Sequence, residues 1–161
     1  MGAYMKLGSL EGEATEQGHK KWIIIESMSS PIFRSIAEGA KDQQRSSGTT
    51  TLGDVVIVRE SDKSSPKLAE ACAKGDVQAE AEIHLCTTAG GKDEPRIKIK
   101  LENVIISSYS FHGNASGSPV PSEEISLNYS KIEWTYVTLD PEKLTPKGQV
   151  VGKYSPGEAK A

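Results

Sequence analysis

Apolar and polar residues alternate along much of the chain, and this period of two predicts β-strands. The alternation is clearest over 77–86, where the odd positions are apolar and the even positions are mostly polar. It resumes over 97–102, beyond a Gly-bearing turn at 89–95. The two segments therefore predict an antiparallel hairpin in which glutamates of the first strand face lysines of the second.

Shorter apolar runs predict further strands on both sides of this hairpin. Its second strand continues through three consecutive apolar residues at 104–106, which favours burial on both faces or a bulge. A change of apolar parity near Ser130, between 125–129 and 132–136, predicts a bulge or bend. The other expected strands are 3–7, 22–28 and 52–59. Such a series of short strands is typical of an antiparallel sandwich or barrel.

A single helix is predicted, over residues 65–74. Ser65 can act as its N-cap, and Pro66 suits the first helical position, where a missing N–H costs no hydrogen bond. Lys74 favours the negative end of the helix dipole, and Gly75 can adopt the left-handed conformation that ends a helix. A helix this short is marginal in isolation, so we expect it to flank the sheet and brace it.

Residues 32–51 lack a sustained period of two or of 3.6 and are mostly polar. A connection of this length without its own structure is uncommon inside a compact domain. Its basic residues interleave with acidic ones, which is not the pattern of a nucleic-acid-binding arm. The composition leaves two alternatives open, a surface loop or an arm that becomes ordered on a neighbouring subunit. After Asp140 the chain is rich in Pro, Gly and Lys, so we expect one domain over 1–140 and a polar, partly disordered tail over 141–161.

Length and charge narrow the functional class. The chain has 161 residues, a net charge of −3 and a mean hydropathy of −0.43. It is long enough for one core and lacks the basic excess that nucleic-acid binding requires. No apolar run approaches the roughly 18 residues of a membrane span, and the N-terminal stretch lacks the apolar region of a secretory signal. We expect folding in the cytoplasm, which favours reduced thiols over a disulfide at Cys72 and Cys86 without fixing their redox state.

No motif in the sequence indicates catalysis, a cofactor or a metal. The histidines lie in different segments, and His84 and Cys86 are expected on a solvated strand face rather than in a zinc site. Residues 90–92 match only part of a phosphate-binding loop and are better explained as a hairpin turn. Glu123 and Glu124 open a strand and are expected to be solvated. We therefore predict a protein that is not an enzyme.

Four stretches, in this order along the chain, resemble the Hcp family, the haemolysin-coregulated tube proteins of bacterial type VI secretion. KSSPKL followed by a helix of small residues is one shared feature, and NVIISSYS followed by SLNYSKIEWTY is another. The similar stretches cover nearly the whole chain, at 3–25, 51–75, 80–113 and 123–136.

The resemblance implies a single antiparallel β-barrel or two-sheet sandwich with one flanking helix, similar to phage tail-tube subunits. It implies a structural subunit of homohexameric rings that stack into an inner tube. Sheath contraction would export this tube, so the protein would be cytoplasmic at first and then secreted without a cleaved signal. The implied partners are the sheath, spike and baseplate proteins and small effector proteins carried in the lumen. No catalytic residues, cofactor, nucleic acid or membrane insertion come with the family.

The resemblance also favours the arm over the surface loop for residues 32–51, with contacts to an adjacent subunit or ring. The expected interface residues are Arg34, Glu38, Lys41, Asp42, Arg45 and Thr50. Ser27 and Ser29 lie where a strand of the family faces the lumen, which makes them candidate cargo contacts. The chain departs from the family pattern beside them, at Met28 and Pro31.

A second class of function is open from the sequence alone, a monomeric β-barrel that binds a small ligand or glycan. It would require Trp22, Tyr109 and Trp134 to converge on a concave, solvent-exposed surface. The strand-periodic positions of both tryptophans favour the core instead, so their burial would argue against this function.

Overall fold

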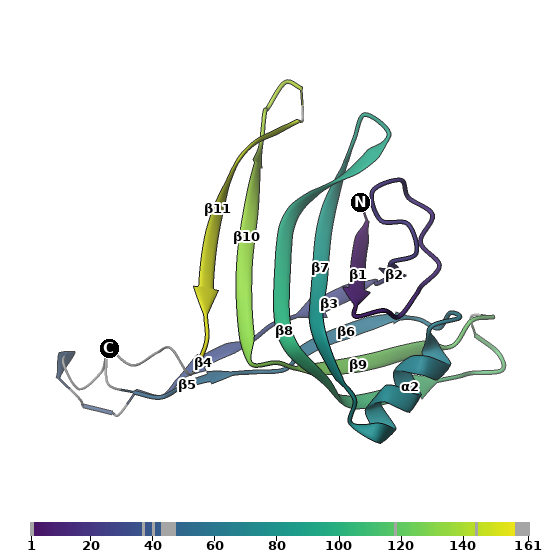
Figure 1. Ribbon diagram of the computed structural model, residues 1–161, viewed down its shortest axis with the longest axis horizontal. Coiled ribbons are helices and arrows are strands. Elements are labelled where there is room, and N and C mark those ends of the chain that lie inside the picture. The colour runs from purple at the N-terminus through teal and green to yellow at the C-terminus, as the bar shows by residue number, and fades with distance from the viewer. Residues whose placement is uncertain are drawn as a thin grey trace.

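A large antiparallel sheet forms most of the molecule, as the computed structural model in Figure 1 shows. The structure describes residues 2–36, 38–39, 41–42, 48–117, 119–143 and 145–156. A helix, α2, spans Ser65–Lys74. The strands are β1 (Ala3–Leu7), β2 (Ile23–Ile24), β3 (Ser27–Ser29), β4 (Ile32–Arg34), β5 (Thr50–Leu52), β6 (Val55–Glu60), β7 (Val77–Ala89), β8 (Lys92–His112), β9 (Ser122–Asn128), β10 (Lys131–Leu139) and β11 (Pro146–Tyr154).

Strand β8 organises the sheet because it changes partners along its length. The strand order is β2-β1-β7-β8-β9-β6-β3, and β10 pairs with β8 while β11 pairs with β10. β8 pairs with β10 up to Glu102 and with β9 from Ile105 onward. Between these two parts Asn103 adopts a left-handed φ of 53°, and its side-chain amide donates to Ser130 Oγ at 2.9 Å. The parity change predicted near Ser130 therefore separates two strands, β9 and β10, instead of bending one.

Two layers result from this exchange of partners. Figure 1 shows β7, β8, β10 and β11 rising from a lower layer that contains β9, β6 and β3. The edge strands of the sheet do not pair with each other, so the sheet is not closed by hydrogen bonds. β2 and β3, at the two ends of the strand order, are instead parts of one continuous segment, 23–29. Ile25 N–H donates to Ala3 O at 3.0 Å, whereas Glu26 N–H donates to Val58 O at 2.9 Å. The mainly antiparallel β class predicted from the sequence is confirmed, with the chain itself joining the two edges.

The core lies between the layers and is built from the predicted apolar positions. Met5, Ile57, Ile83, Leu101 and Leu127 are all fully buried and come from five different strands. Because successive side chains of a strand point to opposite faces, the period of two in the sequence corresponds to these inward-facing positions.

The predicted helix is confirmed and packs against β8. Its start differs from the prediction, since the N-cap is Ser64, without a side-chain capping bond, and Pro66 is the second helical residue. Gly75 ends the helix in the left-handed conformation, with a φ of 67°, as predicted. Leu68 and Ala71 are its buried residues. Among the described residues, no helix has the length and apolar character needed to cross a membrane.

A buried charge cluster joins the helix to the sheet. Arg59 of β6 is 1% exposed, and its guanidinium forms ion pairs with Glu123 of β9 at 2.5 Å and with Asp62 at 2.6 Å. Arg59 Nη1 also donates to Ser64 Oγ at 3.1 Å, next to the start of α2. The Tyr109 hydroxyl donates to the second carboxylate oxygen of Glu123. The expectation that Glu123 is solvated is therefore wrong.

Hydrogen bonds keep Asp62 of this cluster charged. Burial raises the pKa of Asp62, but bonds from Arg59 and Ser64 outweigh burial and lower this pKa below its usual value. Burial and the bond to Glu123 raise the pKa of Tyr109 to about 12. The cluster thus contains a buried charge pair with each oxygen of Glu123 engaged, the condition under which such a pair is tolerated.

Part of the expected polar tail forms a strand that the sequence pattern does not predict. β11 pairs with β10 from Ile132↔Tyr154 to Leu139↔Pro146. Nearly all of its side chains are exposed, so β11 lacks the apolar alternation of a half-buried strand. Its backbone hydrogen bonds define it, and these leave no pattern of side chains in the sequence.

Candidate assembly surfaces

The predicted arm (residues 32–51) lies in a segment whose strands β4 and β5 form a two-stranded ribbon separate from the main sheet. In Figure 1 this ribbon extends away from the body of the molecule. β4 and β5 pair in a register that ends at Arg34↔Thr50. At the base of the ribbon, Gly53 N–H donates to Pro31 O at 2.9 Å. A Cβ at Gly53 would lie 2.6 Å from Pro31 Cγ, so this close approach of the two chains requires glycine.

The structure places most of the predicted interface residues on the arm. Arg34 Nη1 donates to Thr50 Oγ1 at 3.1 Å, a bond across the ribbon. Arg45 lies outside the described residues. Glu38, Lys41 and Asp42 lie in the same segment and have exposed side chains. That the six predicted residues contact another subunit stays a prediction.

The arm also exposes three apolar side chains, which the prediction of interface residues from charge did not include. Phe33 is 60% exposed, Ile36 55% and Ile32 48%. Large apolar side chains exposed close together in one segment mark an interaction site more strongly than single ones scattered over a surface. Their signal in the sequence is the apolar IFRSI run at the start of a polar segment.

β11 leaves one edge unpaired. It bonds to β10 on one side, and no other described strand pairs with its far side. Val150 and Val151 are 69% and 41% exposed. An open strand edge presents unpaired backbone N–H and C=O groups and is a template for pairing with another chain.

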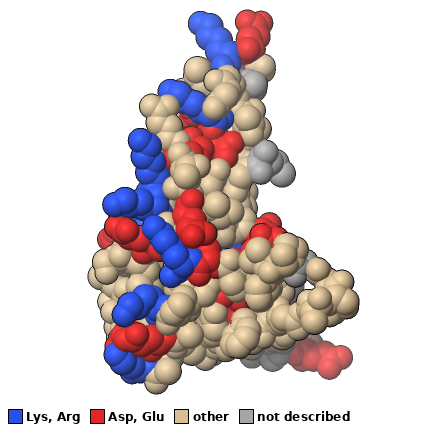
Figure 2. Space-filling view, turned by 90° about the vertical axis from the view of Figure 1, so that its right-hand side faces the viewer, with Lys and Arg blue, Asp and Glu red and all other residues tan. Residues whose placement is uncertain are grey.

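The tall layer carries a ladder of alternating charges on one face. Five residues lie opposite one another across β1, β7, β8, β10 and β11, in the order Lys6, Glu82, Lys100, Glu133 and Lys153. Directly paired residues of antiparallel strands project to the same face, so the five form one row, here called the charge ladder. Figure 2 shows basic and acidic side chains interspersed down one side of the molecule.

The predicted facing of glutamates and lysines is confirmed at Glu82↔Lys100 and differs in the next row. There Glu80 lies opposite Glu102, a pair of like charges. Lys100 Nζ reaches Glu80 Oε1 diagonally at 3.4 Å, and this bond raises the pKa of Lys100. The diagonal contact offsets the repulsion between the two glutamates.

The candidate cargo residues lie at another edge of the sheet. Ser27 and Ser29 belong to β3, which pairs with β6, and both are exposed. Met28 between them packs against the core. Both serines therefore occupy the outward face of an edge strand, and their contact with cargo stays a prediction.

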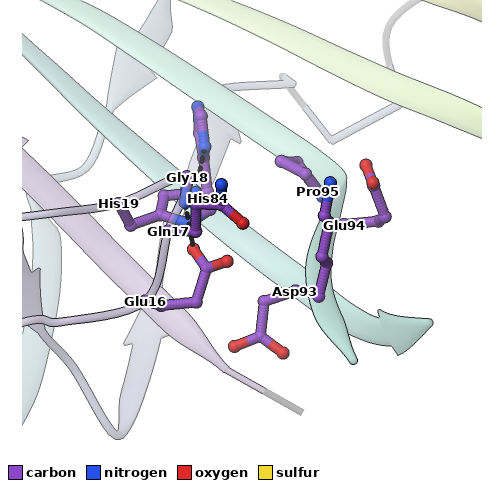
Figure 3. Close-up of a pocket in the computed structure, with 9 residues that line it drawn as sticks. Glu16, Gln17, Gly18, His19, His84, Asp93, Glu94 and Pro95 are labelled. Carbon is purple, nitrogen blue, oxygen red and sulfur yellow. Dashed lines mark hydrogen bonds and ion pairs between the residues drawn. The ribbon is translucent and has the colours of Figure 1, made fainter. Parts of the chain in front are cut away.

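A buried histidine cluster lies beneath the N-terminal loop (residues 8–22), as Figure 3 shows. His19 Nε2 and His84 Nδ1 are 2.9 Å apart, and His19 Nδ1 is 2.6 Å from a carboxylate oxygen of Glu16. His84 is 9% exposed and Cys86 2% exposed. The expected solvated strand face at these two residues is wrong because the N-terminal loop covers it.

A cavity of about 390 Å³ lies beside the histidine cluster, between the N-terminal loop and the start of β8. Asp93 and Glu94 contribute acidic groups to its wall (Figure 3). Within the described part of the chain, no group of three or more His, Cys, Asp or Glu residues is arranged to hold a metal ion. Cys72 and Cys86 are both free, and burial raises the pKa of the Cys86 thiol to about 12.

The aromatic residues that a ligand-binding barrel would need do not converge. Trp22 packs in a small cluster with Cys86. Tyr109 and Trp134 pack instead against the main core between the two layers. The structure therefore provides no shared aromatic surface from these three residues.

Comparisons with known proteins identify what this chain is similar to. A family model described as type VI secretion system effector, Hcp, matches residues 4–136. Protein hcp1 of Pseudomonas aeruginosa is 24% identical over 133 residues, which cover 83% of this chain and 81% of that protein. A solved type six secretion system protein is 28% identical, with a TM-score of 0.88, and the match covers 96% of this chain and 94% of that one. Hcp1 from Salmonella typhimurium shares the fold, with 20% identity, a TM-score of 0.75 and coverage of 99% and 96%.

Proposed function

The chain belongs to the Hcp family, the tube proteins of type VI secretion, and from this premise we propose that six copies close into a ring and that the rings stack into an inner tube. The observation that carries the proposal is the unpaired edge of β11. A repeated head-to-tail contact that returns to its start would leave no subunit with this edge open. The mechanism is therefore assembly, without a chemical step.

In this proposal the arm joins neighbouring subunits or rings. Full burial of an exposed side chain of the size of Phe33 contributes about 1.5–3 kcal/mol, so its burial against a neighbour would supply a useful contact. The interleaved charges of the arm would set the register of the contact and exclude wrong pairings. The residues proposed for this role are Arg34, Glu38, Lys41, Asp42, Arg45 and Thr50.

The tube formed in this way would carry small effector proteins in its lumen, with Ser27 and Ser29 as contacts. Contraction of the sheath would export the tube with its spike after assembly on the baseplate. The protein would accordingly be cytoplasmic before this event and secreted afterwards.

Phe33→Ser tests the arm without disturbing the core, because the Phe33 side chain is 60% exposed. For the unaltered chain, light scattering after size exclusion is expected to give about six times the subunit mass of 17.3 kDa, with larger stacks at high concentration. Loss of about 1.5–3 kcal/mol at the contact should raise the concentration needed for stacks by about tenfold or more.

Phe111→Ser is the matched control, since Phe111 is 68% exposed on β8, outside the arm. It should assemble as the unaltered chain does. A strict monomer at every concentration contradicts the proposal as a whole. Unchanged assembly of Phe33→Ser would contradict the role of the arm alone.

A further inference from the structure

The N-terminal loop rests on the sheet through a small set of side chains. Backbone hydrogen bonds within the loop fix its own shape. Its contact with the sheet centres on His19, whose ring stacks on Tyr4 at a centroid distance of 4.4 Å and meets His84 edge-on at 5.1 Å. Trp22, at the end of the loop, packs 4.7 Å from the His84 ring. The two histidines therefore occupy the centre of the docking contact (Figure 3).

The hydrogen bond between the histidines requires one proton between two nitrogens. His19 Nε2 and His84 Nδ1 are 2.9 Å apart, so one of them donates and the other accepts. If both rings are imidazolium, two N–H groups face each other and the bond is lost. The Glu16 carboxylate, 2.6 Å from His19 Nδ1, can only accept, so His19 Nδ1 carries a proton. The bond to His84 is then kept by a single proton between His19 Nε2 and His84 Nδ1.

The charged groups that face His84 oppose a second proton. Lys98 of β8 lies directly opposite it in the sheet, and His19 faces it from the loop. Glu82 of β7 is the nearest acid, with Oε1 3.9 Å from His84 Nε2, but this side chain is 42% exposed and faces two lysines of the charge ladder. Nε2 itself is buried without a hydrogen-bond partner.

The other titratable groups of the contact are already engaged or uncharged. Glu16 bonds to His19 and accepts from Gly18 N–H at 2.9 Å. Asp93 of β8 accepts from the Tyr4 hydroxyl at 2.5 Å. Cys86 Sγ, 4.0 Å from His19 Nε2, stays protonated because burial raises its pKa. Besides Glu16 and Asp93, the charged groups on the wall of the adjacent cavity are Lys92 and Glu94.

We propose that the His19–His84 hydrogen bond is a proton-controlled latch, and that a second proton on the pair releases the N-terminal loop from the sheet. Every residue of the latch belongs to one subunit. The latch therefore stands apart from ring formation, and either can fail without the other.

The pKa of His84 gives the direction and the range of the effect. Burial, followed by the charges of His19 and Lys98, lowers it from 6.5 to about 4. Release of the loop exposes His84 and restores the ordinary pKa, so the released form takes up the extra proton first as the pH falls. The contribution of neutral His84 to docking of the loop is therefore present in full above pH 6.5 and is lost as the pH falls from 6.5 to about 4. For such a shift the released population rises about 20-fold from pH 7 to pH 5.

Hydrogen exchange of the amides of residues 9–21 measures the latch directly in the full chain. After correction for the intrinsic pH dependence of exchange, their protection factors should fall about 20-fold from pH 7 to pH 5, while those of β8 stay constant. His84→Asn retains a hydrogen-bonding group near the position of Nδ1 but takes up no proton, so its loop should keep the same protection at both pH values. His112→Asn, which removes an exposed histidine of β8, should behave as the unaltered chain.

Protection that does not change with pH in the unaltered chain would overturn the latch, and so would an equal fall in His84→Asn. If His84→Asn does not fold, Trp22 fluorescence in a Trp134→Phe background replaces it. Release exposes Trp22, so its emission should shift to the red between pH 7 and pH 5, and a constant emission overturns the proposal. Light scattering on the same samples measures ring formation separately. If no rings form but the loop still shows its pH-dependent release, the tube proposal is contradicted and the latch is not.

Discussion

The charge ladder and the buried cluster around Arg59 both place basic side chains beside acidic ones, but in opposite surroundings. Lys100 of the ladder is 41% exposed, and Glu80, which it contacts diagonally from the next row, is 60% exposed, whereas Arg59 and Glu123 are 1% and 0% exposed. Water and salt screen the ladder, so each of its pairs adds little to stability. In the buried cluster each charge depends on its partner, because a single charge left there has no solvent to compensate it.

The difference assigns separate tasks to the two regions. The buried cluster joins β6, β9 and the start of α2, so it holds the subunit together. The charge ladder lies on an exposed face, where water surrounds its charges. Similar residue types thus hold strands together in one place and form a solvated surface in the other.

Removal of one buried partner is expected to have the largest effect on stability. Glu123→Ala leaves Arg59 buried and unpaired, and should lower the free energy of unfolding by about 3–5 kcal/mol. Glu124→Ala is the matched control, because Glu124 is the next residue and points to the exposed face. The control should change stability by less than about 0.5 kcal/mol. Urea unfolding of both variants measures the contrast, and equal midpoints would show that the cluster does not hold β6, β9 and the start of α2 together.

A change in the charge ladder should be much smaller and should depend on salt. Lys100→Ala removes the central lysine from a row in which water already screens every pair. We expect a slight loss of stability at low ionic strength that disappears in 1 M salt, where the Debye length is about 3 Å. Thermal unfolding at both salt concentrations is the measurement. A loss that persists in high salt would mean that the ladder contributes through packing and not through charge.

Strands with one apolar face and the helix were predictable because local pattern specifies them. The segment from 77 to 86 has a strict period of two, and Gly75 marks the end of α2. The same pattern places Arg59 and Glu123 on the inward face of their strands, since each shares parity with buried apolar residues. Two opposite charges on inward faces of strands that pair are a signal for a buried ion pair, and the prediction of solvated glutamates overlooked it.

Other features depend on contacts that no local pattern contains. His84 is buried because the N-terminal loop, 65 residues away from it at His19, folds over its strand. β11 has exposed side chains at nearly every position and is held by the backbone of β10. Phe33 is apolar and yet exposed, which becomes informative only once the ribbon is seen to stand apart from the core.

Electron microscopy of the negatively stained full chain tests the central proposal most directly, because it shows ring closure and symmetry together. The proposed closure of six copies through the open edge of β11 predicts rings with six-fold symmetry in the class averages, and stacks of such rings at high concentration. Single subunits at every concentration, or closed rings of a different symmetry, would contradict it.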